Sequence, residues 1–252
     1  MPQLNDFFSS KNSIDKLADT ELSNVNNYLK GIKAFARTTY QSVYVIDYQT
    51  RSFEFVSDNP LFLCGHTANK VQEMGYAFYF KYVIPSDLDL LLKINTIGFE
   101  FYDRLPIEDR ELYSISYDFH LKNQNGNVIL INQKLTPVIL NSEGKIWKAL
   151  CIVSLSSEQQ AGNIRIFKHG ENVFSEYDLE GGFWKKAEKI ILSDREKEIM
   201  HFSTTGLTIT EIAEKLFISP DTVKFHRRKL FEKLNVSNIA EAIAYVTSNK
   251  LI

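Results

Sequence analysis

Three helix-start signals stand close together in the last quarter of the chain, and they constrain its fold more than any other feature. Ser193–Glu196 and Thr208–Glu211 both have the form of a capping box, in which a hydroxyl residue is followed three positions later by Glu. Ser219-Pro220 places an N-cap serine before a proline at the first helical position, where the missing N–H costs nothing. A short turn, Phe217–Ser219, precedes that helix. The pattern predicts short helices joined by tight turns, the last over Asn238–Ser248.

The helix that follows Ser219 carries a local excess of positive charge. The whole chain has 29 Lys and Arg against 31 Asp and Glu, so its formal net charge is 29 − 31 = −2 and its average composition does not point to nucleic acid. Residues 192–252 hold nine Lys and Arg against eight Asp and Glu, 9 − 8 = +1. Between 224 and 233 only Glu232 opposes five cations: Lys224, Arg227, Arg228, Lys229 and Lys233. This basic stripe needs a functional explanation.

Side-chain directions along this helix follow from its turn of about 100° per residue. Val223, Leu230 and Leu234 share one face, which we expect to pack on the core. Lys224, Phe225 and Arg228 point the opposite way, toward whatever the helix meets. Thr222, Lys229 and Lys233 lie on one flank. In the preceding helix, Ala213 is small enough for another helix to cross closely.

These side chains have the chemistry that reads duplex DNA. Arg and Lys donate to guanine in the major groove, and an aromatic ring can contact a thymine methyl, so we expect base contacts from Lys224, Phe225 and Arg228. Short polar side chains, cations and helix N-termini hold phosphates, and the candidates for this role are Thr208, Ser219, Thr222, Lys229 and Lys233. The alternative is a charged face that meets only solvent. An exposed Phe225 among cations, next to a tight turn, favours DNA.

The tail closely resembles the LuxR/FixJ type of DNA-binding domain. The resemblance rests on residues that run through the whole segment: Leu192–Glu196, Gly206–Thr208, Glu211–Ala213, Leu216, Ile218-Ser219, Thr222–Lys224, His226, Lys233-Leu234, Val236 and Glu241-Ala242. It implies that Lys224, Phe225 and Arg228 occupy base-reading positions. It also implies that the final helix is a dimer contact on DNA, for which Ile243 and Val246 are the candidates. Ile209, Thr210 and Ile239 differ from the residues common in the family, so the resemblance assigns no phosphate contacts there.

The front half changes to the period of strands. Short β-branched and aromatic runs occupy 43–48 and 52–57, a mostly helical stretch spans 59–103, and three further strand runs cover 113–122, 128–140 and 146–155. Asn123–Asn127 and Asn141–Gly144 are hairpin turns between the last three. Two strands, a helical middle and a three-strand meander form an α+β pattern.

Residues 40–157 resemble the PAS fold, a five-stranded antiparallel sheet with helices over one face. Phe53–Pro60 looks like the family's second strand running into its first helix. Pro85-Ser86-Asp87 looks like its HPxD segment, with Ile84 in place of His. Tyr117–Lys122 followed by Asn125-Gly126 looks like a later strand and turn, with His120 where Arg is usual. The order and spacing of these motifs carry the resemblance.

We therefore expect an α+β PAS-like antiparallel sheet domain followed by an all-α, four-helix LuxR-type helix-turn-helix domain. The predicted parts are an N-terminal helical segment (1–40), a PAS-like domain with an extra hairpin (41–180), a linker (181–191) and the DNA-binding domain (192–252). The first part rests on a helix predicted from about Ser13 to Ala36, whose apolar stripe from Ile14 to Ala36 packs on its own domain or on a second copy. The hairpin is predicted within 163–177 and a connecting helix within 184–190.

The front half lacks the residues of other domains that accompany such a tail. The acidic pair, strand-end Asp and Lys of a phosphorylated receiver are missing, and Trp147 and Trp184 stand outside any acyl-homoserine-lactone cluster. No GxSxG, HExxH, P-loop or GxGxxG motif occurs, so we predict no enzymatic activity and no catalytic residue. The cofactor stays unknown. The aromatic residues line a small-molecule pocket or form the ordinary core of a module for dimerisation or protein contact.

Cysteine usage and the chain start bear on compartment. Cys64 and Cys151 are the only cysteines, which excludes a disulfide scaffold and a thiolate zinc site and fits a reducing compartment. Cys64-Gly65-His66 lacks the flavin-photosensor signature, so we expect it to be structural and predict no metal site. The start lacks a signal peptide and no apolar run approaches ~18 residues, so we expect a cytoplasmic protein without membrane contact.

Together these features predict a bacterial-type, sequence-specific transcription regulator that binds double-stranded DNA as a homodimer. Its PAS-like domain would sense a signal, with a small molecule as one candidate ligand, or mediate dimerisation. The alternative is an interaction module whose helix-turn-helix contacts a partner protein. A front half with enzymatic activity is the least favoured reading.

Overall fold

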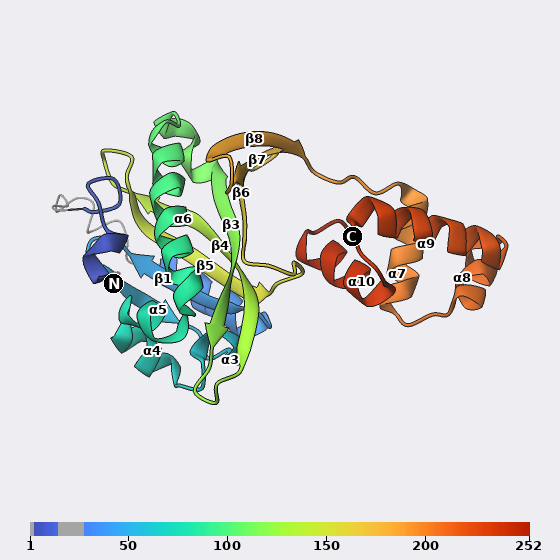
Figure 1. Ribbon diagram of the computed structural model, residues 1–252, viewed down its shortest axis with the longest axis horizontal. Helices are drawn as coiled ribbons and strands as arrows, with labels where there is room; N and C mark the ends of the chain where they lie inside the picture. The colour runs from blue at the N-terminus through green and yellow to red at the C-terminus, as the bar shows by residue number, and fades with distance from the viewer. Residues whose placement is uncertain (1–2, 15–27) are drawn as a thin grey trace. The chain divides into compact units, whose positions relative to one another are not determined.

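The computed structural model describes residues 3–14 and 28–252. The chain divides into two units, Met1–Ala187 and Glu188–Ile252, each of which is described by itself (Figure 1). In the described ranges, no helix is both long and apolar enough to cross a membrane.

The first unit is built on one antiparallel sheet of eight strands in the order β2-β1-β5-β4-β3-β6-β7-β8. The strands are β1 (Ser42–Asp47), β2 (Ser52–Val56), β3 (Tyr113–Lys122), β4 (Val128–Leu140), β5 (Ile146–Leu155), β6 (Gly162–Lys168), β7 (Val173–Asp178) and β8 (Phe183–Glu188). The first five agree with the strand runs predicted from the period-two patterning. The turn after β3 is closed by Gly126, whose φ of +85° suits a residue without a side chain.

Helices cover one face of this sheet, between β2 and β3 in the chain (Figure 1). They are α3 (Pro60–Leu63), α4 (Ala68–Met74), α5 (Ala77–Tyr82) and the long α6 (Pro85–Asp103), followed by the 3-10 turn η2 (Ile107–Leu112). A first 3-10 turn, η1 (Leu4–Phe7), packs beside α6. This arrangement confirms the predicted α+β PAS-like sheet domain. The core between helices and sheet is rich in aromatic rings, including Tyr44, Phe62, Phe78 and Phe119.

Two of the PAS-like sequence motifs meet in space. Asp87 in the first turn of α6 is buried, and its Oδ2 accepts hydrogen bonds from the backbone N–H of His120 at 2.7 Å and from His120 Nδ1 at 2.8 Å. The contact fastens the start of α6 to β3, with His120 standing where the resemblance leads one to expect Arg.

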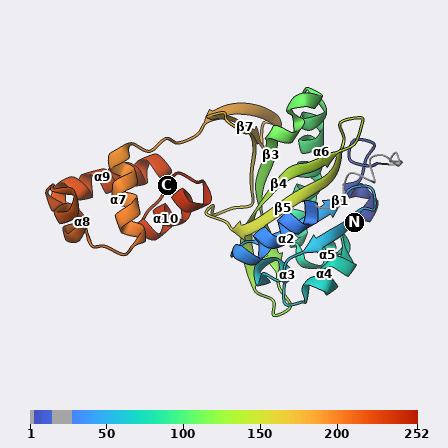
Figure 2. The same cartoon turned by 180° about the vertical axis from the view of Figure 1, so that it is seen from behind.

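Helix α2 (Tyr28–Thr38) lies over the opposite face of the sheet (Figure 2). It contacts β2 through the Tyr28 hydroxyl, which bonds to Glu54, and through the Lys33 ammonium, 5.7 Å from the centre of the Phe55 ring. The predicted start of this helix at Ser13 is wrong. Residues 13 and 14 are not helical, because Asn12 closes a local turn by accepting the Ser9 N–H and donating to the Phe7 carbonyl. Positions 15–27 of the predicted stripe lie outside the described residues.

The segment after the predicted hairpin differs from expectation. β6 and β7 form that hairpin, but the predicted connecting helix within 184–190 is wrong, because residues 183–188 form strand β8. Gly181 and Gly182 stand in the turn before β8, inside the first residues of the expected linker. Trp184 packs edge-on against Tyr177 and Phe101, with both ring centres 5.0 Å away, and this packing favours the strand. The four-part division of the chain itself stays a prediction.

The second unit contains four helices in its described residues: α7 (Asp194–Thr204), α8 (Ile209–Leu216), α9 (Pro220–Leu234) and α10 (Ile239–Ser248). This confirms the predicted all-α, four-helix tail. One apolar cluster joins Leu192, Met200, Leu230, Leu234, Ala242 and Val246, and another joins Ile199, Ile212, Ala213 and Val223. As predicted, Val223, Leu230 and Leu234 form the buried face of α9.

Candidate nucleic-acid interface and buried pocket

Local hydrogen bonds fix where the helices of the second unit begin. The Ser193 hydroxyl accepts the Glu196 N–H while the Glu196 carboxylate accepts the Ser193 N–H, and Thr208 and Glu211 repeat the arrangement. Ser219 accepts the Thr222 N–H at 3.1 Å ahead of Pro220. These caps confirm the three predicted helix starts, and they set α8 and α9 on either side of the turn at 217–219.

Ala213 of α8 is buried in one apolar cluster with Val223 of α9, as its small side chain predicts. Phe217 ends α8 in the left-handed region, with φ +53°, and its side chain is 95% exposed. Sequence reasoning treated Phe217 only as a turn residue and missed this exposed ring. The sequence feature that could have revealed it is a large apolar residue at a helix end, where the left-handed backbone favours Gly or Asn.

The opposite side of α9 carries an exposed basic and aromatic surface, which we call the α9 outer face: Lys224, Phe225, Arg228 and Lys229. Phe225 is 43% exposed. The Lys229 ammonium lies 4.7 Å from the centre of the Phe225 ring and the Arg228 guanidinium lies 5.9 Å from it. Lys224 pairs with Asp221 at 3.0 Å, and both side chains are exposed. The structure therefore brings together the three residues predicted to contact bases.

The residues predicted to contact phosphates are placed less uniformly. The Thr208 hydroxyl donates to the Glu211 carboxylate at 2.7 Å, and the Ser219 and Thr222 hydroxyls bond to each other at 2.8 Å. These three lie at the first turns of α8 and α9. Lys233 is engaged within the unit, because its ammonium bonds to the Glu196 carboxylate at 2.8 Å.

Two ionisable groups beside this surface have shifted pKa values. Burial alone would raise the pKa of the Glu196 carboxyl, but its bonds to Lys233 and Ser193 outweigh burial and lower it. Burial lowers the pKa of Arg227, whose guanidinium lies 5.8 Å from the Phe231 ring centre. The stem of Arg227 thus covers apolar surface.

The last helix places the two predicted dimer residues differently. Val246 is 0% exposed within the unit's own core, so the prediction that its side chain is free to meet a partner is wrong. Ala242 and Val246 are four residues apart on α10 and turn the same way toward the core. Ile243 is half-buried, and Ala240, Ala244 and Thr247 form the exposed face.

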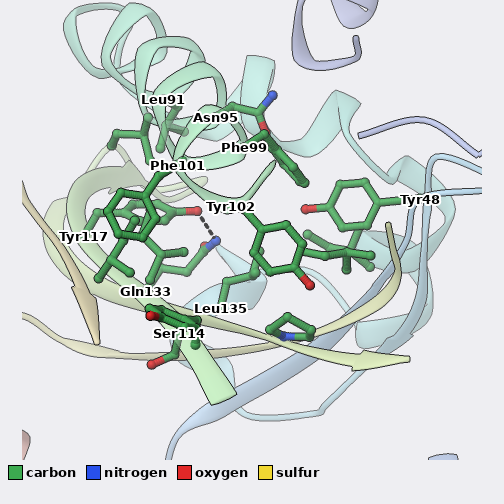
Figure 3. A pocket seen from close by; sticks show the side chains of 18 of the residues that line it. Tyr48, Leu91, Asn95, Phe99, Phe101, Tyr102, Ser114, Tyr117, Gln133 and Leu135 are labelled. Atoms are coloured by element: carbon green, nitrogen blue, oxygen red, sulfur yellow. Dashed lines mark hydrogen bonds between the residues drawn. The ribbon is translucent and has the colours of Figure 1, made fainter. Parts of the chain in front are cut away.

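The first unit encloses a pocket between α6 and the sheet (Figure 3). Its free space, with the solvent at its mouth included, amounts to about 800 Å³. Nine aromatic residues line it: Phe7, Tyr48, Tyr76, Tyr79, Phe99, Phe101, Tyr102, Tyr113 and Tyr117. Leucine, isoleucine and proline side chains fill most of the remaining wall, and Asn95, Ser114 and Gln133 are its other polar residues.

Most polar groups of the pocket are already paired. The Gln133 amide donates to the Tyr117 hydroxyl at 2.6 Å and its oxygen accepts from the Tyr44 hydroxyl at 2.7 Å; Figure 3 draws the first bond. Asn95 donates to the Phe7 carbonyl at 2.6 Å. The Tyr102 hydroxyl is buried without a hydrogen-bond partner among the described residues. Burial raises the pKa of Tyr48, Tyr76, Tyr79, Tyr102 and Tyr117, so these hydroxyls keep their protons.

The Cys64-Gly65-His66 segment lies outside the pocket lining. Cys64 is buried at the end of α3 with φ +51°, and burial raises the pKa of its thiol to about 12. His66 bonds to the hydroxyl of Tyr82 and to the amide of Gln124. In the described part of the chain, no group of three or more His, Cys, Asp or Glu residues is placed to hold a metal ion.

Comparisons with known proteins find sequence similarity mainly in the second unit. Residues 190–246 match the family described as "Bacterial regulatory proteins, luxR family". The "Probable transcriptional regulatory protein NarL" of Mycobacterium tuberculosis (strain ATCC 25618 / H37Rv) is 40% identical over 62 residues, 25% of this chain and 29% of the relative. The "Transcriptional activator protein EsaR" of Pantoea stewartii subsp. stewartii is 34% identical over 93 residues, 35% of this chain and 37% of the relative. The chain thus spans about a third of the length of these relatives.

The matches to solved structures cover more of the chain than these relatives do. The phage VqmA-DPO complex is 16% identical with a TM-score of 0.32, over 91% of this chain and 91% of that one. The PAS domain of a protein from Colwellia psychrerythraea is 12% identical with a TM-score of 0.38, over 52% of this chain and 98% of that one. The strand order, rather than these scores, establishes the fold of the first unit.

Proposed function

Since residues 190–246 form a helix-turn-helix domain of the luxR family of bacterial regulatory proteins, we propose that the chain is a sequence-specific DNA-binding transcription regulator acting in the cytoplasm. The observation that carries the proposal is the α9 outer face. Helices of this motif place their exposed side chains in the major groove, where cations meet guanine and apolar groups meet thymine methyls. Lys224, Phe225 and Arg228 are the base-contacting residues of this proposal.

Phosphate contacts would come from the ends of the same helices. Thr208, Ser219 and Thr222 lie beside the N-termini of α8 and α9, where backbone N–H groups and the helix dipole favour anions. Lys229 is exposed and flanks the base-contacting residues. Lys233 must exchange its bond to Glu196 for a phosphate, so we rank its contribution below that of Lys229.

A comparison of single substitutions on a selected duplex tests this assignment. Arg228→Ala is expected to cost about 1–3 kcal/mol on the preferred site and to relax selection at one base pair. Lys229→Ala is expected to weaken all sequences equally and to reduce the salt slope by about one. Lys197→Ala removes the same charge from the exposed side of α7 and serves as the matched control. Unchanged selection by Arg228→Ala from a randomised library contradicts the base-contact assignment.

We also propose that the active species on DNA is a two-fold dimer, because one recognition helix reads only a few base pairs. On α10 the surface open to a partner is Ala240, Ala244 and Thr247, with Ile243 at its edge. Ala244→Glu is expected to abolish cooperative filling of two half-sites and to leave single half-site binding intact. Footprinting on full and half operators measures both. Cooperativity that survives this change moves the contact to another surface, including α2.

The first unit is proposed to sense a small molecule. The pocket supports this role, and Phe101 lines the pocket while contacting Trp184 of β8, the strand that ends at Glu188 where the second unit begins. A ligand that displaces the Phe101 ring would therefore act on the segment joined to the DNA-binding unit. In the competing proposal the first unit binds no ligand and serves only dimerisation or protein contact.

A further inference from the structure

The pocket carries no charge on its walls. None of its lining residues is Asp, Glu, Lys, Arg or His among the residues that the structure describes. Two cations lie near lining rings, and both are engaged. The Arg110 guanidinium, 5.2 Å from the centre of the Tyr102 ring, donates to the carbonyls of Leu105, Gly144 and Asp103. The Lys168 ammonium, 5.7 Å from the centre of the Tyr113 ring, pairs with the Asp109 carboxylate at 2.9 Å. A carboxylate or phosphate entering the pocket would lose its hydration without gaining a free cation. The free-energy cost of this loss is far larger than the cost of burying an uncharged group.

One polar atom of the pocket stands apart from the others. Tyr102 is 8% exposed, and its hydroxyl has no hydrogen-bond partner in the described part of the molecule. Figure 3 shows its ring inside the pocket, across from Tyr48. By contrast, Tyr117 is bonded to Gln133, and Asn95 to the Phe7 carbonyl. A buried hydroxyl left unpaired is unfavourable, and a ligand with a suitable oxygen or nitrogen would satisfy it.

The shape of the walls narrows the ligand further. Aromatic rings stand on several sides of the pocket, contributed by Phe7 of η1, Tyr48 after β1, Phe99 of α6 and Tyr117 of β3. Rings pack on planar groups in offset or edge-on geometry, so a flat, ring-sized molecule gains most from such walls.

We propose that the pocket binds a small uncharged aromatic compound carrying a hydrogen-bond acceptor, and that Tyr102 donates to this acceptor. The inference rests on the proposed sensing function, and it names the class of signal and the residue that selects it. The acceptor satisfies Tyr102, the rings enclose the flat body, and the uncharged walls reject acids and phosphates.

Titration calorimetry of the full chain with three probes tests the proposal. Acetophenone is uncharged and carries one acceptor, α-methylstyrene has the same shape without an acceptor, and benzoate carries a charge. We expect acetophenone to bind and benzoate to bind at least ten-fold more weakly. Tyr102→Phe is expected to weaken acetophenone about five-fold or more while leaving α-methylstyrene unchanged. Tyr40→Phe removes the same atom from a residue exposed outside the pocket, and it is the matched control.

Stability gives an independent readout of Tyr102. Because the substitution removes an unpaired buried hydroxyl, Tyr102→Phe is expected to raise the melting temperature of the ligand-free chain by about 2–4 °C. Tyr117→Phe is expected to lower it, because the buried Gln133 side-chain N–H loses its acceptor, the Tyr117 hydroxyl.

Several results would overturn the ligand class. They are equal binding of benzoate and acetophenone, no binding of either uncharged probe at millimolar concentration, or an acetophenone preference that survives Tyr102→Phe. The same samples are then assayed on the selected duplex. Retained DNA binding means that only the ligand class fails, whereas loss of DNA binding by the unmodified chain overturns the proposed function instead.

Discussion

Lys148 of β5 forms a buried ionic network whose removal has a calculable effect. Its ammonium lies 2.7 Å from the Asp47 carboxylate and 2.8 Å from that of Glu54, and its side chain is 6% exposed. Glu54 also accepts a bond from Tyr28 of α2, so the network ties α2 to the sheet. Lys148→Met keeps most of the aliphatic stem and leaves the two carboxylates without their cation.

The magnitude follows from the remaining contacts. Removing one partner of a buried ion pair costs about 3–5 kcal/mol. Asp47 keeps hydrogen bonds from the backbone N–H groups of Gln49 and Thr50, and Glu54 is partly exposed, so we expect the lower end, about 3 kcal/mol. With a urea m-value of about 1–3 kcal/mol/M, the unfolding midpoint should fall by about 1 M or more.

Urea unfolding followed by tryptophan fluorescence measures this loss. Trp147 is a local reporter, because its ring centre lies 5.0 Å from the Lys148 ammonium. Lys145→Met breaks the surface pair with Glu143 and should cost less than about 1 kcal/mol, which makes it the control. Adding Asp47→Asn and Glu54→Gln to Lys148→Met should restore part of the stability. A Lys148→Met loss no larger than that of the control would show that the buried ion pairs contribute little to stability.

Three further predictions concern single sites. Burial raises the pKa of the Asp118 carboxyl, against an opposing hydrogen bond from Ser156. Because the folded-state pKa then lies above the unfolded-state pKa, the free energy of unfolding falls as the pH rises from the unfolded-state value through the folded-state value. In melts of both proteins, Asp118→Asn should therefore be more stable than the parent at pH 7, but not at a pH below the unfolded-state pKa. Ala213→Leu should cost about 1–3 kcal/mol by forcing α8 and α9 apart, more than Ala213→Gly, in melts of the full chain. Val246→Glu should unfold the second unit, seen as lost helical circular dichroism, because an unpaired carboxylate in its core costs about 3–5 kcal/mol.

Each of these changes has an outcome that contradicts it. For Asp118→Asn, the contradicting outcome is a stability difference from the parent that is the same at every pH. An Ala213→Leu variant as stable as the parent would place Ala213 outside the crossing. A folded Val246→Glu variant with lost cooperativity on DNA would restore Val246 as a dimer residue.

The helices of the second unit could be predicted because their determinants are local. A cap such as Ser193 with Glu196 acts within one turn, and the spacing of Val223, Leu230 and Leu234 reveals the buried face of α9 without any knowledge of its partner. The first five strands were predicted for a similar reason, since alternation of apolar residues is visible within each strand.

The predictions that proved wrong concern residues whose conformation or burial depends on contacts distant in the sequence. Residues 183–188 form β8 because Trp184 finds Phe101 of α6 and Tyr177 of β7. On α10, Ile239, Ala242, Ile243 and Val246 are all apolar, and only packing against the unit's other helices decides that Val246 is buried and Ile243 half-buried.

The capped helices, the basic and aromatic outer face of α9 and the α+β class of the first unit can be read from the sequence alone, because they depend on residues within a turn or strand of one another. The pocket cannot, because it exists only in the packed unit. Its walls come from η1, α6 and the sheet, and in residues 3–14 and 28–252 no group from these distant segments is placed to pair with the Tyr102 hydroxyl. Burial and hydrogen-bond pairing are properties of the whole packed unit, so composition and periodicity do not encode them locally.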